Sequence, residues 1–272
     1  MRRGTKWVAL GSLAGIVALS ACASSNNEGE AMTAAQASVH DDPPEVAHMG
    51  FLKEALAKLS LRPDQKPLVE QLSREAEVRH QPIQKARADL QGAIADQIAA
   101  GKIDRTALKP QIDALVQAIE ASRAADRVAL GRLHDILDPA QRNQLVDTIE
   151  EHFKGGRHDR PGMGRARKWA TDLKLTDGQR DQIRTALRAK FQGQRDSMKG
   201  DWQAAREKGR EMLEAFRRDA FAPDANVPVF GRDKVEHRVG RALDFAETVL
   251  PVLTPEQRSL AADKVRSEHG RF

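Results

Sequence analysis

The chain has 272 residues, of which 31% are charged and 4% aromatic, and it contains no tyrosine. This composition is typical of long amphipathic helices and argues against a sheet protein. The single cysteine, Cys22, excludes an intramolecular disulfide. The formal net charge of +5 includes an excess in residues 154–272, which hold 26 basic and 18 acidic residues. That excess suits acidic or anionic partners, although a solvated Arg-rich helix face would have the same composition.

Residues 1–21 have the pattern of an export signal. Arg2, Arg3 and Lys6 precede an apolar run at residues 7–19, and this run is too short for a membrane-spanning helix. Leu19-Ser20-Ala21-Cys22 resembles the lipobox of bacterial lipoproteins. The resemblance implies cleavage before Cys22 and acylation of Cys22, and three acyl chains would anchor the protein stably. Ordinary cleavage after Ala23 is the alternative.

The residue after Cys22 bears on the destination of the protein. Ala23 stands where the lipoprotein sorting pattern has aspartate for inner-membrane retention. The resemblance therefore implies a lipid anchor on the periplasmic side of a bacterial membrane, the outer membrane if the source is Gram-negative. Residues 22–46 are acidic and lack apolar periodicity, which predicts a flexible tether.

Residues 47–153 carry the pattern of a long helical hairpin. A short amphipathic helix is expected at residues 46–59. Apolar residues then recur every three or four positions from Leu68 to Ile98 and again from Leu108 to Ile136. Gly101 is expected to end the first long helix and Asp104 to cap the second. Pro82 predicts a bend.

A second unit follows a linker and repeats the plan. Residues 154–165 are rich in Gly and Arg, which indicates a linker. Within residues 166–272, an apolar stripe from Ile183 to Phe216 predicts an outgoing arm, and a second stripe from Val235 to Leu250 predicts the returning helix. Together these patterns predict an elongated all-α protein made of two bent antiparallel hairpins.

A short motif begins a helix four times, at residues 61–66, 137–142, 175–180 and 253–258. Thr or Asp at its second position can cap the helix, Pro suits the first helical position, and Gln at the fifth position can reach back to the cap. Arg62 breaks the pattern because it cannot accept a hydrogen bond. The motif residues are Leu61, Gln65, Leu137, Asp138, Gln141, Leu175, Thr176, Gln179, Leu253, Thr254 and Gln257.

The spacing of the motif indicates an internal duplication. Leu61 and Leu137 are 76 residues apart, Leu175 and Leu253 are 78 apart, and the two pairs start 114 residues apart. Paired L-T-x-x-Q helix starts on a helical hairpin behind an export signal resemble the Spy/CpxP family of periplasmic chaperones and stress regulators. In that family two chains pair into a curved, cradle-like dimer. The resemblance implies either an intramolecular pseudo-dimer or two units that each pair with another chain.

No catalytic constellation is evident, and the chain is not expected to be an enzyme or to hold a cofactor or metal. No two histidines have the helical chelate spacing. Asp233 with His237, and His134 with Asp138, are interpreted as helix-surface pairs. His152 and His158 flank the linker and leave a weak metal site as an alternative.

A client-binding surface is the remaining candidate site. The stripe of the second unit offers apolar residues beside basic ones, which suits unfolded segments with apolar and acidic groups. The alternative is that the stripe is the core of the hairpin itself. The candidate residues are Phe191, Met198, Trp202, Arg206, Arg210 and Met212.

These observations predict an ATP-independent envelope chaperone or stress-response adaptor that binds unfolded or envelope proteins while anchored to a membrane. A periplasmic sensor domain is a further expected partner, a homodimer remains open, and export makes nucleic acid an improbable partner. A metal-responsive sensor and a structural spacer lipoprotein are the alternatives.

Overall fold

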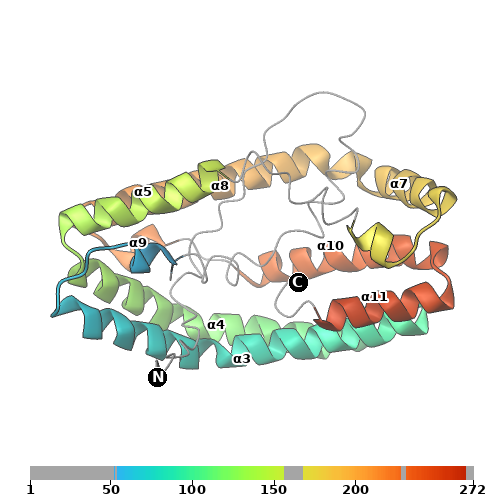
Figure 1. Ribbon diagram of the computed structural model, residues 1–272, viewed down its shortest axis with the longest axis horizontal. Helices are drawn as coiled ribbons and strands as arrows, with labels where there is room; N and C mark the ends of the chain where they lie inside the picture. The colour runs from blue at the N-terminus through green and yellow to red at the C-terminus, as the bar shows by residue number, and fades with distance from the viewer. Residues whose placement is uncertain (1–51, 53, 156–167, 228–230, 268–272) are drawn as a thin grey trace, which may run out of the picture.

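The computed structural model describes residues 52, 54–155, 168–227 and 231–267. Within these ranges the regular structure is entirely helical and no strand occurs, so the all-α prediction is confirmed. The signal peptide, the tether, Cys22 and His158 lie outside the described residues. The described part is elongated, with helices running along its length in two layers (Figure 1).

The first half contains the long hairpin that the periodicity predicts. A short helix at residues 54–57 precedes it. Helices α3 (Gln65–Ala100) and α4 (Arg105–Ile136) form the two antiparallel arms, and α5 (Pro139–Gly155) turns back over them. Helix α3 continues through Pro82, halfway along its length, and the hairpin changes direction near its middle in Figure 1.

The turn between α3 and α4 follows the predicted signals. Gly101 ends α3 in the left-handed conformation, with φ 79°. The carboxylate of Asp104 then accepts hydrogen bonds from the backbone N–H groups of Thr106 and Ala107, at 3.0 and 3.1 Å. Both end signals are therefore confirmed.

Gly101→Ala and Gly92→Ala are expected to change stability in opposite directions. Alanine at residue 101 would sit at positive φ, and its Cβ would collide with the guanidinium of Arg258, so we expect a loss of about 1–2 kcal/mol. Residue 92 lies inside α3 with open space around its Cβ position, so alanine should add about 0.5–1 kcal/mol there. Urea unfolding followed by circular dichroism measures both, and equal effects would contradict this account of the turn.

The second half consists of shorter helices. A helical segment at residues 168–172 comes first. The elements that follow are α7 (Asp177–Phe191), η1 (Gln192–Gln194), α8 (Arg195–Arg217), α9 (Pro223–Asn226), α10 (Arg232–Val249), η2 (Leu250–Val252) and α11 (Pro255–Ser267).

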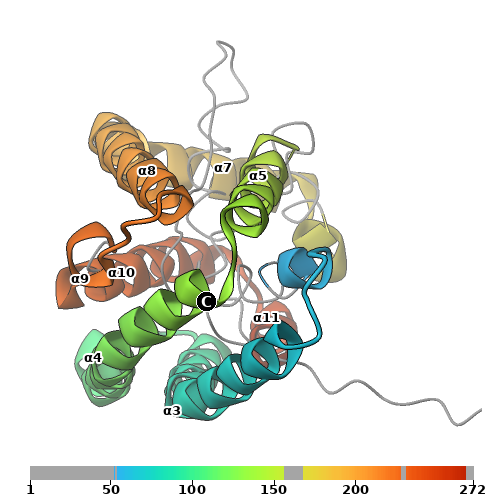
Figure 2. The same ribbon diagram turned by 90° about the vertical axis from the view of Figure 1, so that its left-hand side faces the viewer.

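The outgoing arm of the second half is interrupted, unlike that of the first. The apolar stripe predicts one helix, whereas the 3₁₀ turn η1 separates α7 from α8. Helix α7 packs on α10, but α8 packs on α5 of the first half and on the short α9. Gly193 lies within η1, and the low helix propensity of glycine favours a break there. Figure 2 shows α5 and α8 above the α3–α4 layer.

The two halves pack head to tail, so each end of the molecule contains parts of both. At one end, Met212, Leu213 and Phe216 of α8 join a buried cluster formed mainly by α3, α4 and α5. At the other end, the turn between α3 and α4 lies beside α10 and α11 (Figure 1), and α3 and α11 share a second buried cluster. Burial of these apolar faces is the main stabilising contribution to both ends.

A buried polar group separates the two clusters within the α3–α4 hairpin. The first cluster uses α3 residues up to Ala76 and the second begins at Ile83. Between them, the carboxylate of Asp126 contacts Nε2 of His80, at 2.9 Å from both carboxylate oxygens, and accepts from Nε of Arg79 at 2.7 Å. Burial opposes ionisation of Asp126, but its hydrogen bonds with His80 and Arg79 prevail and lower its pKa.

Leu68 departs from the predicted stripe. Its side chain is 45% exposed, whereas Val69 is buried in the first cluster. One residue along a helix rotates the side chain by about 100°, so the face of α3 that packs in its first turn is shifted from the face that the sequence pattern indicates.

Candidate functional site

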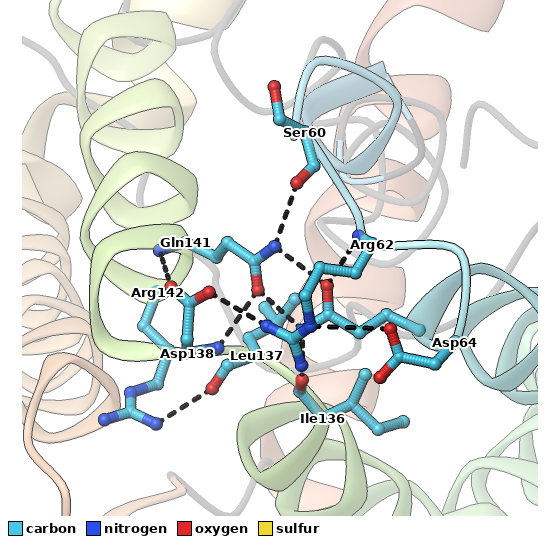
Figure 3. Close-up of polar contacts among 9 residues, drawn as sticks. Ser60, Arg62, Asp64, Ile136, Leu137, Asp138, Gln141 and Arg142 are labelled. Carbon is cyan, nitrogen blue, oxygen red and sulfur yellow. Dashed lines mark hydrogen bonds and ion pairs between the residues drawn. The ribbon is translucent and has the colours of Figure 1, made fainter.

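The four helix-start motifs meet in two pairs, and the first pair joins Gln65 to Gln141. Each side-chain amide donates to the other's Oε1, at 2.8 and 2.9 Å. Nε2 of Gln65 also donates to the carbonyl oxygen of Ile136 at 2.6 Å, and Nε2 of Gln141 donates to that of Ser60 at 3.0 Å. Figure 3 shows this arrangement, which we call the first junction.

Each glutamine of the first junction also binds its own helix start. Oε1 of Gln65 accepts from the backbone N–H of Arg62 at 2.9 Å, and Oε1 of Gln141 accepts from that of Asp138 at 3.0 Å. Gln65 is 1% exposed. Because a buried amide without partners is costly, the pairing both caps two helices and satisfies two buried side chains.

Gln179 and Gln257 form the second junction in the same way. Nε2 of each donates to Oε1 of the other, at 2.8 and 3.1 Å. The outer donations again go to carbonyl oxygens, to Val252 at 2.9 Å and Lys174 at 3.4 Å. Thr176 and Gln179 form a complete capping box. The repeated spacing in the sequence therefore corresponds to a repeated structure.

The first copy of the motif has no capping side chain, and Arg62 makes a different contact. Asp64 at the start of α3 makes no side-chain cap. Arg62 instead donates through Nη1 to the carboxylate of Asp138 at 3.1 Å, across the junction. The charge of Arg62 thus bridges the two motif copies.

The arginine that follows the glutamine has a role that sequence reasoning missed. Arg142 and Arg180 each donate to the carbonyl oxygen of the leucine that opens their own motif, Leu137 and Leu175, both at 3.0 Å. Arg142 also pairs with Asp219 of the second half, and the side chain of Arg258 lies beside Gly101 of the first half. Arg142 and Arg258 are the sixth residues of the second motif copy in each half. Each of these arginines thus contacts the turn region of the opposite half. The available signal was arginine at the sixth position of three motif copies.

The leucines that open the four motif copies pack into the two buried clusters. Leu137 belongs to the first buried cluster, while Leu175 and Leu253 belong to the second, and Leu61 packs against the first. The paired glutamines are neutral amides, and the motif leucines are buried aliphatic groups. Their arrangement is structural.

Ion pairs supplement the apolar contacts between the halves. Arg105, the first residue of α4, donates to Glu247 and Asp244 of α10, both at 2.7 Å. The hydrogen bond with Glu247 is the largest contribution to the raised pKa of Arg105. Arg232 pairs with Asp113 at 2.6 Å. Both pairs connect the first turns of α4 to α10 of the second half.

The candidate client residues are not gathered on one exposed face. Phe191 is 2% exposed and packs with Leu187 beside Phe245 of α10, and Met212 is buried in the first cluster. Phe191 is thus part of the core of its own half, as the alternative interpretation expects, whereas Met212 is covered by helices of the first half. Arg206 and Arg210 are exposed on α8. Met198 and Trp202 lie in α8, but their side chains are outside the described residues.

One of the two histidine pairs, His134 with Asp138, differs from its interpretation as a surface pair. His134 is buried, and its Nε2 donates to the carbonyl oxygen of Arg218 at 2.7 Å. Its ring stacks on Phe221. The pairing with Asp138 is therefore wrong, since Asp138 instead caps α5 by accepting from the N–H of Gln141 at 2.9 Å. Asp233 and His237 are both exposed in the first turns of α10.

Among the described residues, no group of three or more His, Cys, Asp or Glu side chains is placed to hold a metal ion. None of the helices in those ranges combines the length and apolarity needed to cross a membrane. Comparison with family models, curated proteins and solved structures found no match.

Proposed function

We propose that this protein is a membrane-anchored envelope chaperone or stress adaptor similar to the Spy/CpxP family, which holds unfolded or partner proteins without bond chemistry. The observation that carries the proposal is the pairing of the four L-T-x-x-Q-type starts into two equivalent junctions. The residues that bear the family resemblance thus act together in the fold.

The head-to-tail packing of the halves supports an intramolecular counterpart of the family's dimer. Each half supplies one junction and one hairpin turn, and each turn lies against the other half. One chain would then provide the surface that two chains provide in the family. Anchoring through Cys22 would keep this surface in the envelope, where its clients unfold.

The proposal predicts that the protein suppresses aggregation of an unfolded client without ATP. The test uses the mature chain from residue 22 onward with Cys22→Ser, mixed with reduced insulin, and light scattering reports aggregation. Stoichiometric amounts should suppress scattering, and about 0.5 M salt should weaken the effect because screening removes attraction between basic helices and acidic clients. No suppression for several unrelated clients at equal molar amounts would contradict the proposal.

A further inference from the structure

The apolar face at the end of α8 is covered by α5 of the same chain. Met212, Leu213 and Phe216 of α8 are buried in one cluster with Leu145, Val146 and Ile149 of α5. The two helices pack against each other along the upper layer in Figure 1. The part of the candidate client stripe around Met212 is therefore covered by a segment of the protein itself.

Ion pairs lie at the edge of the contact between α5 and α8. Arg217 of α8 donates to Asp147 at 2.7 Å and lies 3.7 Å from Glu150, both on α5. The Asp147 side chain is 61% exposed, and the Asp219 partner of Arg142 is 88% exposed. Their arginine partners are largely covered, with Arg217 20% and Arg142 7% exposed. Reversing the charge of an acidic partner therefore leaves a poorly solvated arginine beside a like charge.

Helix α8 is joined to the rest of its half through a turn suited to bending. η1 interrupts the arm between α7 and α8, and short 3₁₀ segments within helices are common hinge positions. On the other side of this turn, Phe191 of α7 packs beside Phe245 of α10. The packing of α7 on α10 is therefore separate from the packing of α8 on α5.

The charges of α5 and α8 are complementary. Residues 206–217 of α8 contain four basic and three acidic residues, whereas residues 142–151 of α5 contain one basic and three acidic residues. The face of α8 therefore fits an acidic amphipathic helix with apolar residues at positions i, i+1 and i+4, which is the pattern of Leu145, Val146 and Ile149.

We propose that α5 occupies the client-binding face of α8, and that acidic amphipathic segments of other proteins bind this face after displacing α5. This inference rests on the proposed holding function and identifies its site and its client chemistry. The closed arrangement is then autoinhibited, and weakening the ion pairs at the rim opens the site.

A fluorescent peptide that copies residues 139–152 tests the inference directly. The mature chain is compared with an open variant, Asp147→Lys with Glu150→Lys, whose own α5 repels Arg217. The open variant should bind the peptide about tenfold more tightly than the parent chain, as measured by fluorescence anisotropy. Adding Arg217→Glu to the open variant should abolish the gain, because the peptide's acids then meet an acid.

Two controls make the binding result specific. Asp89→Lys changes an exposed acid on α3, which pairs with Lys85 of the same helix, and should leave peptide affinity unchanged. A scrambled peptide should bind no variant. Should the reversed charges unfold the chain, Asp147→Asn with Glu150→Gln weakens the same pairs and should give a smaller gain in affinity. Equal affinity of the parent and every folded rim variant, or equal binding of the scrambled peptide, would overturn the inference.

Aggregation assays on the same variants separate the two proposals. Enhanced peptide binding without suppression of client aggregation would refute the chaperone function and leave the displacement of α5 standing. Suppression by the parent chain that neither open variant increases, together with unchanged peptide affinity, would refute the inference and leave the function standing.

Discussion

Replacing Gln65 with methionine is expected to lower the free energy of unfolding by about 3 kcal/mol. Methionine keeps the volume of the side chain but removes its hydrogen bonds to Arg62, Ile136 and Gln141. Each buried hydrogen bond contributes about 1 kcal/mol, and each buried partner left unsatisfied costs about 1–3 kcal/mol. Thermal or urea unfolding followed by circular dichroism measures the loss.

Two matched variants test whether the junction is responsible for that loss. Gln141→Met removes the other half of the first junction and should cost a similar amount, and the double variant should cost much less than the sum of the two. Gln71→Met removes an exposed amide that bonds only within α3, to Glu75, and should change stability by less than about 0.5 kcal/mol. Similar small effects at all three positions would contradict the junction.

Asp126→Asn is expected to destabilise the protein by about 3 kcal/mol near neutral pH, because the change leaves Arg79 and His80 buried without their anionic partner. The side chains of Asp126, Arg79 and His80 are 11%, 16% and 4% exposed. The pKa of Asp126 is lowered in the folded protein. Its contribution is therefore fully present above the unfolded pKa of about 3.9 and is lost as pH falls from there through the folded pKa.

The pH dependence distinguishes this effect from a simple packing defect. The difference in unfolding free energy between the parent chain and Asp126→Asn should be largest above about pH 5 and should shrink below about pH 4. Asp89→Asn, which weakens an exposed pair with Lys85 at 2.6 Å, should cost less than about 0.5 kcal/mol. A difference that stays constant from neutral to acidic pH would show that the charge of Asp126 is not the cause.

The first half of the fold is largely predictable from local signals. Apolar periodicity located α3 and α4, and Gly101 and Asp104 marked the turn between them, because caps and helix ends depend on residues near in sequence. The motif predicted the back-bonding glutamine for the same reason.

The contacts that depend on distant residues were not predictable in the same way. Periodicity shows that Phe191 and Met212 lie on an apolar stripe, but it does not show which helix covers that stripe. The mutual binding of Gln65 and Gln141 requires two helix starts to meet in space, and only their repeated spacing hinted at it. The break at η1 gave no strong local signal beyond Gly193, while Gly200 and Gly209 lie within α8 without ending it.

Intrachain pairing of the two halves is tested most directly by a crosslink between Arg105→Cys and Glu247→Cys in a Cys22→Ser background. In the folded chain the side chains of these two residues are 2.7 Å apart. A mixture of unlabelled and ¹⁵N-labelled protein, treated with a short thiol crosslinker and analysed by mass spectrometry, separates crosslinks within one chain from those between chains. Crosslinks whose two sides carry the same isotope are expected, and mixed-isotope crosslinks or no crosslinking would contradict the head-to-tail arrangement of one chain.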